Sequence, residues 1–474
     1  MKIGVVSLGC PKNLVDAEVM LGLAEQAGHE ITTDAQGADV LIVNTCAFID
    51  RAKQESIDAI LEMAELKRQA AGRRLVVTGC LAERYRDELQ KEIPEIDAVL
   101  GTGEVPRILE ALTGSPVPSP RSPVNRLTFY KRDPESPQPA GDTLTFGIDL
   151  PDYLYDASTP RRLATPGHYA YLKIAEGCDY KCAFCIIPKM RGHYRSRTIA
   201  SIVQEAQSLA ARGVKELLLI SQDTTFFGND RQERGALSRL LRELNAVDGL
   251  EWIRLLYLYP TTISDEVIDT IAQSDRVCKY IDLPLQHASD AVLRRMKRPG
   301  TRAGYVKLLD RIRARIPGVV LRTTFIVGFP GETEEDFDIL VGFVDDMKFD
   351  HLGVFTYSHE EGTTAFGLAD DVPAATKKRR QSRLMSRQRR LVERRQKARV
   401  GERTRLLVDG PSPEHELVLR GRLQGQAPDV DSLVYLTDCD PGQVVAGDFL
   451  DVEIVGAKGY DLVARPQVGP AFGR

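Results

Sequence analysis

Short apolar runs alternate with helical stretches along two parts of the chain, and this alternation excludes most folds. Near the N-terminus, apolar runs at 2–9, 38–46 and 73–80 are each followed by a stretch with helical spacing. Six more apolar runs, with helical patterns between them, occupy residues 169–358. Strands that alternate with helices of this length favour parallel sheets. We therefore expect an α/β protein with an N-terminal parallel sheet, followed by a partial (β/α)6 barrel that falls short of a full (β/α)8 ring.

The remaining segments have a different character. Residues 114–163 are rich in Pro and Ser, which favours an extended linker. After Gly401, short apolar runs punctuated by Gly, Pro and Asp predict a small C-terminal β-barrel. The 474 residues suffice for roughly three domains of ~150 residues each. We expect these domains at 1–113, 164–398 and 399–468.

The composition excludes membrane and disulfide-stabilised classes. No apolar run approaches the ~20 residues that cross a bilayer. The seven residues between Lys2 and Cys10 suit a buried strand better than the apolar region of a signal peptide. Eight cysteines are too sparse for a disulfide scaffold, and their spacing favours metal ligation in a reducing compartment. We expect a cytoplasmic protein that makes no membrane contact.

Three N-terminal cysteines share one position relative to the predicted strands. Cys10, Cys46 and Cys80 end the strings "SLGC", "NTC" and "TGC", each at the close of an apolar run. Neighbouring parallel strands lie ~4.8 Å apart, and their carboxyl ends meet at one edge of the sheet. The three thiols are therefore expected to converge on one site.

A second cysteine group lies in "EGCDYKCAFCIIP", which places Cys178, Cys182 and Cys185 in a C-x3-C-x2-C loop after the first barrel strand. Three thiolates without a fourth suit a [4Fe–4S] cluster with one open iron, because such clusters are held by cysteine. The alternative is a structural zinc site, which needs four ligands and would have to recruit His193. Two further cysteines, Cys278 and Cys439, match no ligand position and are expected to be ordinary small buried residues.

The C-x3-C-x2-C loop, with Phe184 before its third cysteine, resembles that of the radical S-adenosylmethionine superfamily. The resemblance implies that the open iron chelates S-adenosylmethionine and that the reduced cluster cleaves it to a 5′-deoxyadenosyl radical. It also implies cofactor contacts at two strand ends, namely Gln222 and Asp223 in "ISQDTTFFG" and Gly328 and Gly331 in "IVGFPGET". The second string has a simpler interpretation as a strand-to-helix turn capped by Thr333.

Over essentially its whole length the chain resembles the methylthiotransferase family. The resemblance implies a second [4Fe–4S] cluster on Cys10, Cys46 and Cys80, whose open iron would hold the sulfur to be transferred. S-adenosylmethionine would then serve as both radical source and methyl donor, and flavodoxin or ferredoxin as electron donor. The terminal barrel resembles the TRAM module, which grips the substrate macromolecule. No proton donor or acceptor can be assigned from the sequence.

One branch of this family modifies a tRNA adenosine, and another modifies the β-carbon of an aspartate in ribosomal protein S-twelve. The strings "SLGCPKNLVDAE" and "LPLQHASDAVLRRMKR" resemble the second branch. Residues 401–474 carry a net charge of −5, which disfavours RNA and favours a basic ribosomal protein. Residues 377–399 carry +11 and fit either a solvated helical face or a contact with ribosomal RNA. A non-catalytic iron–sulfur redox protein is the remaining alternative, although it would need no polar strand ends.

Overall fold

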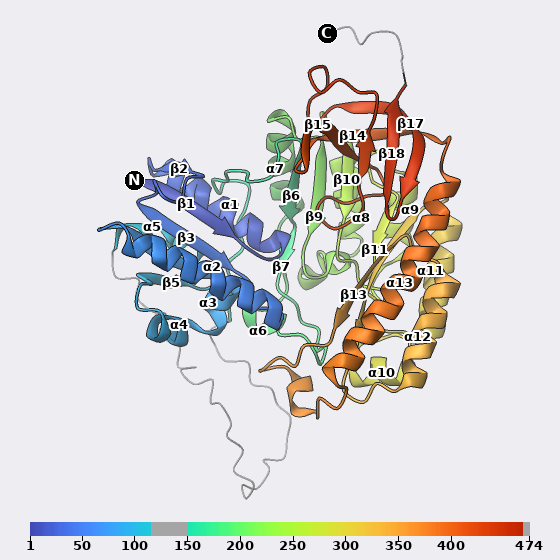
Figure 1. The fold of residues 1–474 in the computed structure, drawn as a ribbon, viewed down its shortest axis with the longest axis horizontal. Helices are drawn as coiled ribbons and strands as arrows, with labels where there is room; N and C mark the ends of the chain where they lie inside the picture. The colour runs from blue at the N-terminus through green and yellow to red at the C-terminus, as the bar shows by residue number, and fades with distance from the viewer. Residues whose placement is uncertain (115–149, 468–474) are drawn as a thin grey trace, which may run out of the picture.

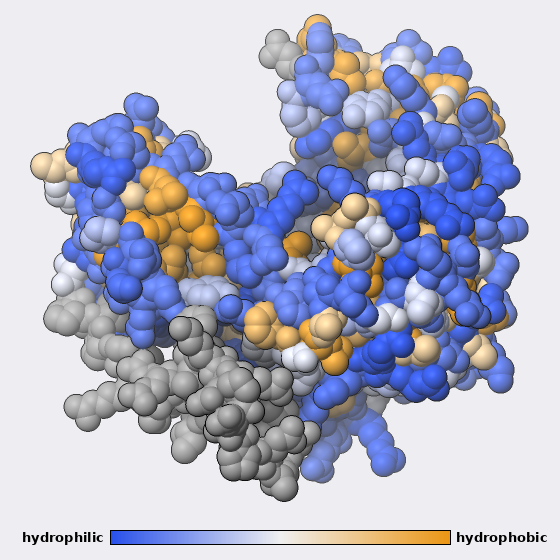
Figure 2. Space-filling view, turned by 60° about the horizontal axis from the view of Figure 1, so that its bottom comes forward, coloured by the Kyte–Doolittle hydropathy of each residue, from blue (hydrophilic) through white to orange (hydrophobic). Residues whose placement is uncertain are grey.

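The computed structural model describes residues 1–114 and 150–467, in which an N-terminal module packs beside a half-barrel that carries a small closed barrel (Figure 1). The predicted linker falls mostly on residues outside this description. Its remaining part, 150–163, contains no helix or strand. This segment packs closely against the N-terminal module at Gly22, where a Cβ would stand 2.5 Å from the backbone nitrogen of Arg161. Seen as a surface, the N-terminal module forms one lobe, and an open notch separates it from the other (Figure 2).

The N-terminal sheet is parallel, as predicted, but it has five strands in the order β2-β1-β3-β4-β5. The strands are β1 (Lys2–Ser7), β2 (Glu30–Thr32), β3 (Val40–Thr45), β4 (Arg74–Gly79) and β5 (Ala98–Leu100). Three of them were expected from their apolar runs. The two edge strands were missed because three residues are too few to show a period.

The helices of this module are α1 (Pro11–Gln26), α2 (Asp50–Arg68), α3 (Cys80–Arg84), α4 (Arg86–Glu92) and α5 (Ile108–Thr113), with a 3₁₀ turn, η1 (Val105–Arg107). One helix was expected where α3 and α4 lie. Tyr85, with φ −132° and ψ 36°, interrupts it. The break lets α3 begin directly at Cys80, at the end of β4.

The second module contains the six predicted parallel strands in two three-stranded sheets, β10-β9-β6 and β11-β12-β13. They are β6 (Tyr169–Lys173), β9 (Glu216–Ile220), β10 (Trp252–Leu255), β11 (Tyr280–Asp282), β12 (Val320–Val327) and β13 (His351–Thr356). The amide of Cys278 donates to the carbonyl of Ile253 across 2.9 Å and joins the two sheets. The partial barrel expected from the sequence is confirmed.

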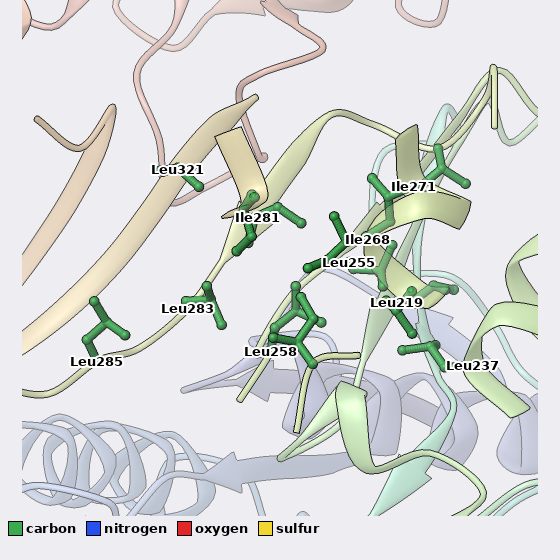
Figure 3. Packing of buried hydrophobic residues seen from close by; sticks show 14 of the residues in the cluster. Leu219, Leu237, Leu255, Leu258, Ile268, Ile271, Ile281, Leu283, Leu285 and Leu321 are labelled. Atoms are coloured by element: carbon green, nitrogen blue, oxygen red, sulfur yellow. The ribbon is translucent and has the colours of Figure 1, made fainter. Parts of the chain in front are cut away.

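Helices cover the outer face of this half-barrel. They are α7 (Ile199–Ala211), α8 (Ala236–Asn245), α9 (Asp265–Gln273), α10 (Asp290–Arg295), α11 (Arg302–Arg315) and α12 (Glu334–Met347). Figure 3 shows Leu219 and Leu255 of the strands lying among side chains of α8 and α9. Alternate residues of β9 face the other way, because side chains of a strand point to opposite faces. Leu218 and Ile220 share a second cluster with Val15 and Val19 of α1, and Figure 1 shows α1 between the N-terminal sheet and β6.

The C-terminal module is a closed barrel in the order β14-β15-β16-β18-β17, which confirms the small β-barrel expected here. Its strands are β14 (Arg403–Ser412), β15 (His415–Leu423), β16 (Val434–Leu436), β17 (Phe449–Lys458) and β18 (Asp461–Pro466). The sequence had indicated four of them. The last strand, β18, lies between β16 and β17 and closes the barrel.

Buried ion pairs fix this barrel to the amino ends of the half-barrel strands. Glu216, the first residue of β9, contacts Arg422 at 2.6 Å and Arg254 at 2.7 Å, and all three side chains are fully buried. The loop 424–433 inserts beside them: the Tyr280 hydroxyl donates to Asp431 across 2.7 Å. Arg322 of β12 lies 3.3 Å from Asp431, so this negative charge of the terminal module is neutralised inside the molecule.

The basic segment forms helix α13 (Ala374–Ala398), with Leu384 and Val392 buried against the half-barrel. Its cations pair with carboxylates in and around α12. The pairs are Arg379 and Arg380 with Glu334, Arg383 with Asp338, Arg387 with Asp345 and Arg395 with Asp350. This face of the helix is an ion-pair ladder rather than a simply solvated surface. No helix within the described residues is long and apolar enough to span a bilayer.

Candidate active site

The three N-terminal cysteines lie at one edge of the N-terminal sheet. Cys10 caps α1 directly after β1, Cys46 follows β3, and Cys80 begins α3 after β4, and these strands are neighbours. A Cβ on Gly9 would stand 2.9 Å from the Cys46 sulfur, so only glycine lets the β1–α1 turn approach that closely. Ser56 holds the other side of Cys46 by accepting from its amide and donating to its carbonyl, both at 2.9 Å.

Burial sets the chemistry of this first triad. Cys80 is only 5% exposed, and burial raises its pKa to about 12, with Cys10 and Cys46 adding to the rise and Arg191 opposing it. The Cys80 thiol therefore remains protonated at neutral pH unless a cationic centre stabilises the thiolate. Bound metal does this, because a coordinating thiol is deprotonated outright. The triad has the character of a metal ligand set rather than of a free nucleophile.

The second triad lies in the loop between β7 (Ala175–Glu176) and α6 (Ile187–Arg191). Cys178, Cys182 and Cys185 are half-buried and interact electrostatically, and burial raises the pKa of Cys178 to about 12. Arg298 lies 3.8 Å from the Cys182 sulfur and 3.8 Å from the centre of the Tyr259 ring. A guanidinium at this distance stabilises a thiolate and would support a metal ligand.

The zinc alternative gains nothing from the geometry. The His193 ring is exposed and lies 2.9 Å from the Asp179 carboxylate, so the structure does not place it as a fourth zinc ligand. In residues 1–114 and 150–467, no three His, Cys, Asp or Glu side chains converge closely enough to hold a single ion. An iron–sulfur cubane carries each thiolate on a different iron, so its ligands need no common point. Both triads therefore fit a cluster better than one ion.

Two predicted cofactor residues lie at the carboxyl end of β9. The Gln222 side-chain amide donates to Glu176, while its Oε1 is buried with no hydrogen-bond partner among the described residues. Such a group is available to a ligand, because buried polar atoms are normally satisfied. Asp223 Oδ1 accepts from the amides of Thr225 and Phe226, while its Oδ2, like Gln222 Oε1, is buried with no hydrogen-bond partner among the described residues. Burial raises the pKa of Asp223.

The "GFPGET" segment forms the expected turn. Thr333 accepts from the Asp336 amide at 3.1 Å and completes a capping box before α12. Gly328 and Gly331 have φ of 78° and 74°, which favour glycine, and a Cβ on Gly328 would stand 2.3 Å from Lys377. The turn alone accounts for both glycines, so their contact with a cofactor remains a prediction. Phe184 packs at the edge of an apolar cluster that contains Phe329.

A buried network that the sequence analysis missed joins the two triads. Arg191 of α6 donates to the Cys80 sulfur across 3.5 Å and to the Asn13 oxygen across 3.0 Å, and it pairs with Asp16 at 2.5 Å. Glu176, two residues before Cys178, lies 3.3 Å from the same guanidinium. Lys173 bonds to both carboxylates. The only signal in the sequence is the pair of acidic residues, Asp16 and Glu18, within the apolar helical pattern of α1.

Lys12 is the second helical residue of α1, close to Cys10. It is 7% exposed, and its ammonium lies 2.9 Å from the centre of the Tyr257 ring, which follows β10. Burial lowers the pKa of Lys12 to about 8, so the amine is mostly protonated at neutral pH. The remaining two cysteines lie elsewhere: Cys278 is fully buried, as expected, whereas Cys439 is only half-buried.

Family models match each of the three modules. Residues 2–101 match the Uncharacterized protein family UPF0004, residues 172–344 match the Radical SAM superfamily, and residues 400–466 match the TRAM domain. The matches to the second and third models agree with the barrels expected from the sequence. They assign radical S-adenosylmethionine chemistry to the half-barrel.

Curated relatives match almost the whole chain. The ribosomal protein uS12 methylthiotransferase RimO of Trichlorobacter lovleyi is 47% identical over 464 residues, which cover 98% of each chain. The protein of the same name from Symbiobacterium thermophilum is 48% identical over 465 residues, covering 98% of this chain and 91% of the relative. That from Koribacter versatilis is 47% identical over 490 residues.

A solved structure supports the fold independently. The radical S-adenosylmethionine methyltransferase TsrM from Kitasatospora setae superposes with a TM-score of 0.53 at 17% identity, covering 75% of this chain and 72% of the other. At this identity the likeness shows only that the two chains share a fold.

Proposed function

Because this chain belongs to the ribosomal protein uS12 methylthiotransferase RimO family, we propose that it adds a methylthio group to the β-carbon of an aspartate in ribosomal protein uS12. It is a radical S-adenosylmethionine transferase. The observation that carries the proposal is the presence of two cysteine triads at strand ends of two sheets, joined by the buried Arg191 network. A redox carrier would need the clusters but no cofactor pocket, so the buried, unpartnered Gln222 Oε1 counts against that alternative.

Each triad has residues suited to one [4Fe–4S] cluster. Cys178, Cys182 and Cys185 would hold the cluster that supplies the radical chemistry of S-adenosylmethionine. Gln222 and Asp223 are the best-placed of the predicted cofactor contacts, since each has a buried oxygen with no hydrogen-bond partner among the described residues. Cys10, Cys46 and Cys80 would hold the second cluster and the sulfur to be transferred. The packing of α1 against β6 would hold the two modules at a fixed relative position, and so would keep the substrate close to the cofactor.

The charge of the terminal barrel supports a protein substrate less strongly than the sequence suggested. Asp431 and Asp409 belong to its negative charge, yet both face the half-barrel, where Tyr280 and His168 bind them. The net negative charge that remains on the outer surface of the barrel is therefore smaller in magnitude than −5. Family membership, rather than charge, therefore favours uS12 over tRNA. The proposed setting is the cytoplasm, with uS12 free or within the small ribosomal subunit and with flavodoxin or ferredoxin as electron donor.

The test is anaerobic reconstitution with iron and sulfide, followed by dithionite, S-adenosylmethionine and either uS12 or tRNA. We expect 5′-deoxyadenosine and a gain of about 46 Da on uS12, one methylthio group replacing hydrogen. Cys10→Ala should abolish the mass gain and retain cofactor cleavage, while Cys439→Ala should behave as wild type. Modification of tRNA alone would refute the uS12 assignment, and failure to cleave the cofactor would refute the enzyme assignment.

A further inference from the structure

We propose that Lys12 binds the side-chain carboxylate of the substrate and so determines that the enzyme acts on an acidic residue. This inference rests on the proposed function, in which the reacting carbon is the β-carbon of an aspartate. The γ-carboxylate is bonded directly to that carbon. A cation that holds the carboxylate beside Cys10 would therefore fix the reacting carbon next to the cluster that carries the sulfur.

The first support is a largely buried lysine whose ammonium has no hydrogen-bond or ion-pair partner among the described residues. Lys12 is 93% buried, and among residues 1–114 and 150–467 its Nζ makes neither a hydrogen bond nor an ion pair. Its close neighbour is the face of the Tyr257 ring. Burying a charge without a partner is unfavourable, and a cation–π contact offsets only part of that cost. A bound carboxylate would complete the site.

The two carboxylates nearest to Lys12 are already paired with other cations. Its electrostatic neighbours are Cys10, Glu176 and Asp282. Glu176 pairs with Lys173 at 2.6 Å, and Asp282 pairs with Arg322 at 3.0 Å. Neither carboxylate lies within ion-pair distance of Lys12. Among the described residues no carboxylate pairs with Lys12, so its ammonium can bind a carboxylate that comes from outside the chain.

The position of Lys12 in its helix points to the same conclusion. It lies in the first turn of the 16-residue helix α1, which contains no acidic residue there. The amino end of a helix favours anions, so a lysine is unfavourable at this place unless an anion is bound. The helix end and the ammonium would attract a carboxylate together. Neighbouring Asn13 holds the turn rigid by donating to the carbonyls of Leu8 and Thr45 at 2.8 and 2.9 Å.

The ring beneath Lys12 is also held in place. Tyr257 has φ of 60°, which is uncommon for a residue with a side chain, and its amide donates to Asp282 across 2.9 Å. Strained backbone of this kind is often found at binding sites. The aromatic face fixes the direction of the lysine stem and gives the ammonium few alternative positions.

The test compares wild type with Lys12→Met, Lys12→Arg and the exposed control Lys91→Met. Each reconstituted protein is given uS12 and a uS12 variant in which the modified aspartate is asparagine, and both affinity and methylthiolation are measured. Wild type should bind the aspartate form about 10- to 100-fold more tightly, as for one charge-assisted contact. Lys12→Met should bind both forms equally, Lys12→Arg should retain part of the preference, and Lys91→Met should match wild type.

The two hypotheses fail in different ways. If wild type leaves uS12 unmodified, the proposed function is wrong, and the assignment of Lys12 is withdrawn with it. If wild type modifies uS12 and Lys12→Met keeps the full preference for aspartate, only the assignment of Lys12 is overturned. An unchanged preference together with an altered electron paramagnetic resonance signal of the Cys10 cluster would show that Lys12 serves the cluster instead.

Discussion

The guanidinium of Arg191 donates to the sulfur of Cys80 across 3.5 Å and thereby connects the loop that carries one cysteine triad to the sheet that carries the other. The two residues are 111 positions apart in the chain. Asp16 and Glu176 flank the same guanidinium. Arg191 is therefore one of the buried side chains that fix the relative placement of the two triads, together with Lys173, which pairs with Asp16 at 2.5 Å.

Arg191→Met should destabilise the protein and impair assembly of the N-terminal cluster. It leaves two buried carboxylates with Lys173 as their remaining cation, and breaking a buried ion pair in this way costs about 3–5 kcal/mol. The measurements are urea unfolding and iron content. Arg212→Met, on the exposed end of α7, is the control and should change neither. Equal stability of both variants would show that the network does not hold the modules together.

Glu216→Gln should loosen the terminal barrel. The Glu216 carboxylate is fully buried between Arg254 and Arg422, so its loss leaves Arg254 without a carboxylate partner and Arg422 with Asp409 alone, and costs about 3–5 kcal/mol. The exposed pair of Glu251 with Arg405 belongs to the same interface, and Glu251→Gln should cost less than about 1 kcal/mol. Limited proteolysis near residue 400, together with urea unfolding, would detect the difference. Similar losses in both variants would contradict the importance of burial.

Removing two carboxylates from α12 should expose the basic helix to RNA. Asp338→Asn with Asp345→Asn frees Arg383 and Arg387, whose ion pairs measure 3.0 and 2.6 Å. Two more free cations should raise the salt slope for binding single-stranded RNA by about 1.4, because each phosphate contact contributes ~0.7. Stability should fall by less than about 1 kcal/mol per pair. An unchanged salt slope would show that the ladder does not mask α13.

The strands of the half-barrel were predictable because each lies within an apolar run bounded by turns, as Glu216–Ile220 does, and even the three-residue β11 lies inside the longer run 279–285. The placement of the cysteines was predictable for a related reason, since a residue that directly follows a strand must lie at the edge of the sheet where that strand ends. The Arg191 network was not predictable. Asp16 is buried only because α1 packs against a module that begins some 150 residues later, and local sequence carries no signal of that contact. The same argument applies to Lys12, because only the folded structure reveals that its ammonium has no hydrogen-bond or ion-pair partner among the described residues.

His287 and Glu332 should give the stability of the protein opposite dependences on pH. Both side chains are fully buried, with His287 Nε2 3.8 Å from the Glu332 carboxylate. Burial lowers the pKa of His287 from 6.5 to about 3. Below pH 6.5 the unfolded chain therefore binds the extra proton, and stability falls as the pH falls. Burial raises the pKa of Glu332 from 4.5 to about 7 despite the Arg380 guanidinium at 3.1 Å, so the folded protein binds the extra proton between these values and stability rises as the pH falls.

In wild type these two contributions largely cancel between pH 7.5 and 5.5, and single substitutions should separate them. Glu332→Gln leaves the histidine alone and should lose about 1 kcal/mol of unfolding free energy over that interval, whereas His287→Gln should gain about 2 kcal/mol. Urea unfolding of the three proteins at both pH values measures the difference. His29→Gln, a substitution on the surface, provides the matched control and should follow wild type. Parallel profiles for all four proteins would show that neither buried group changes its protonation on unfolding in this range.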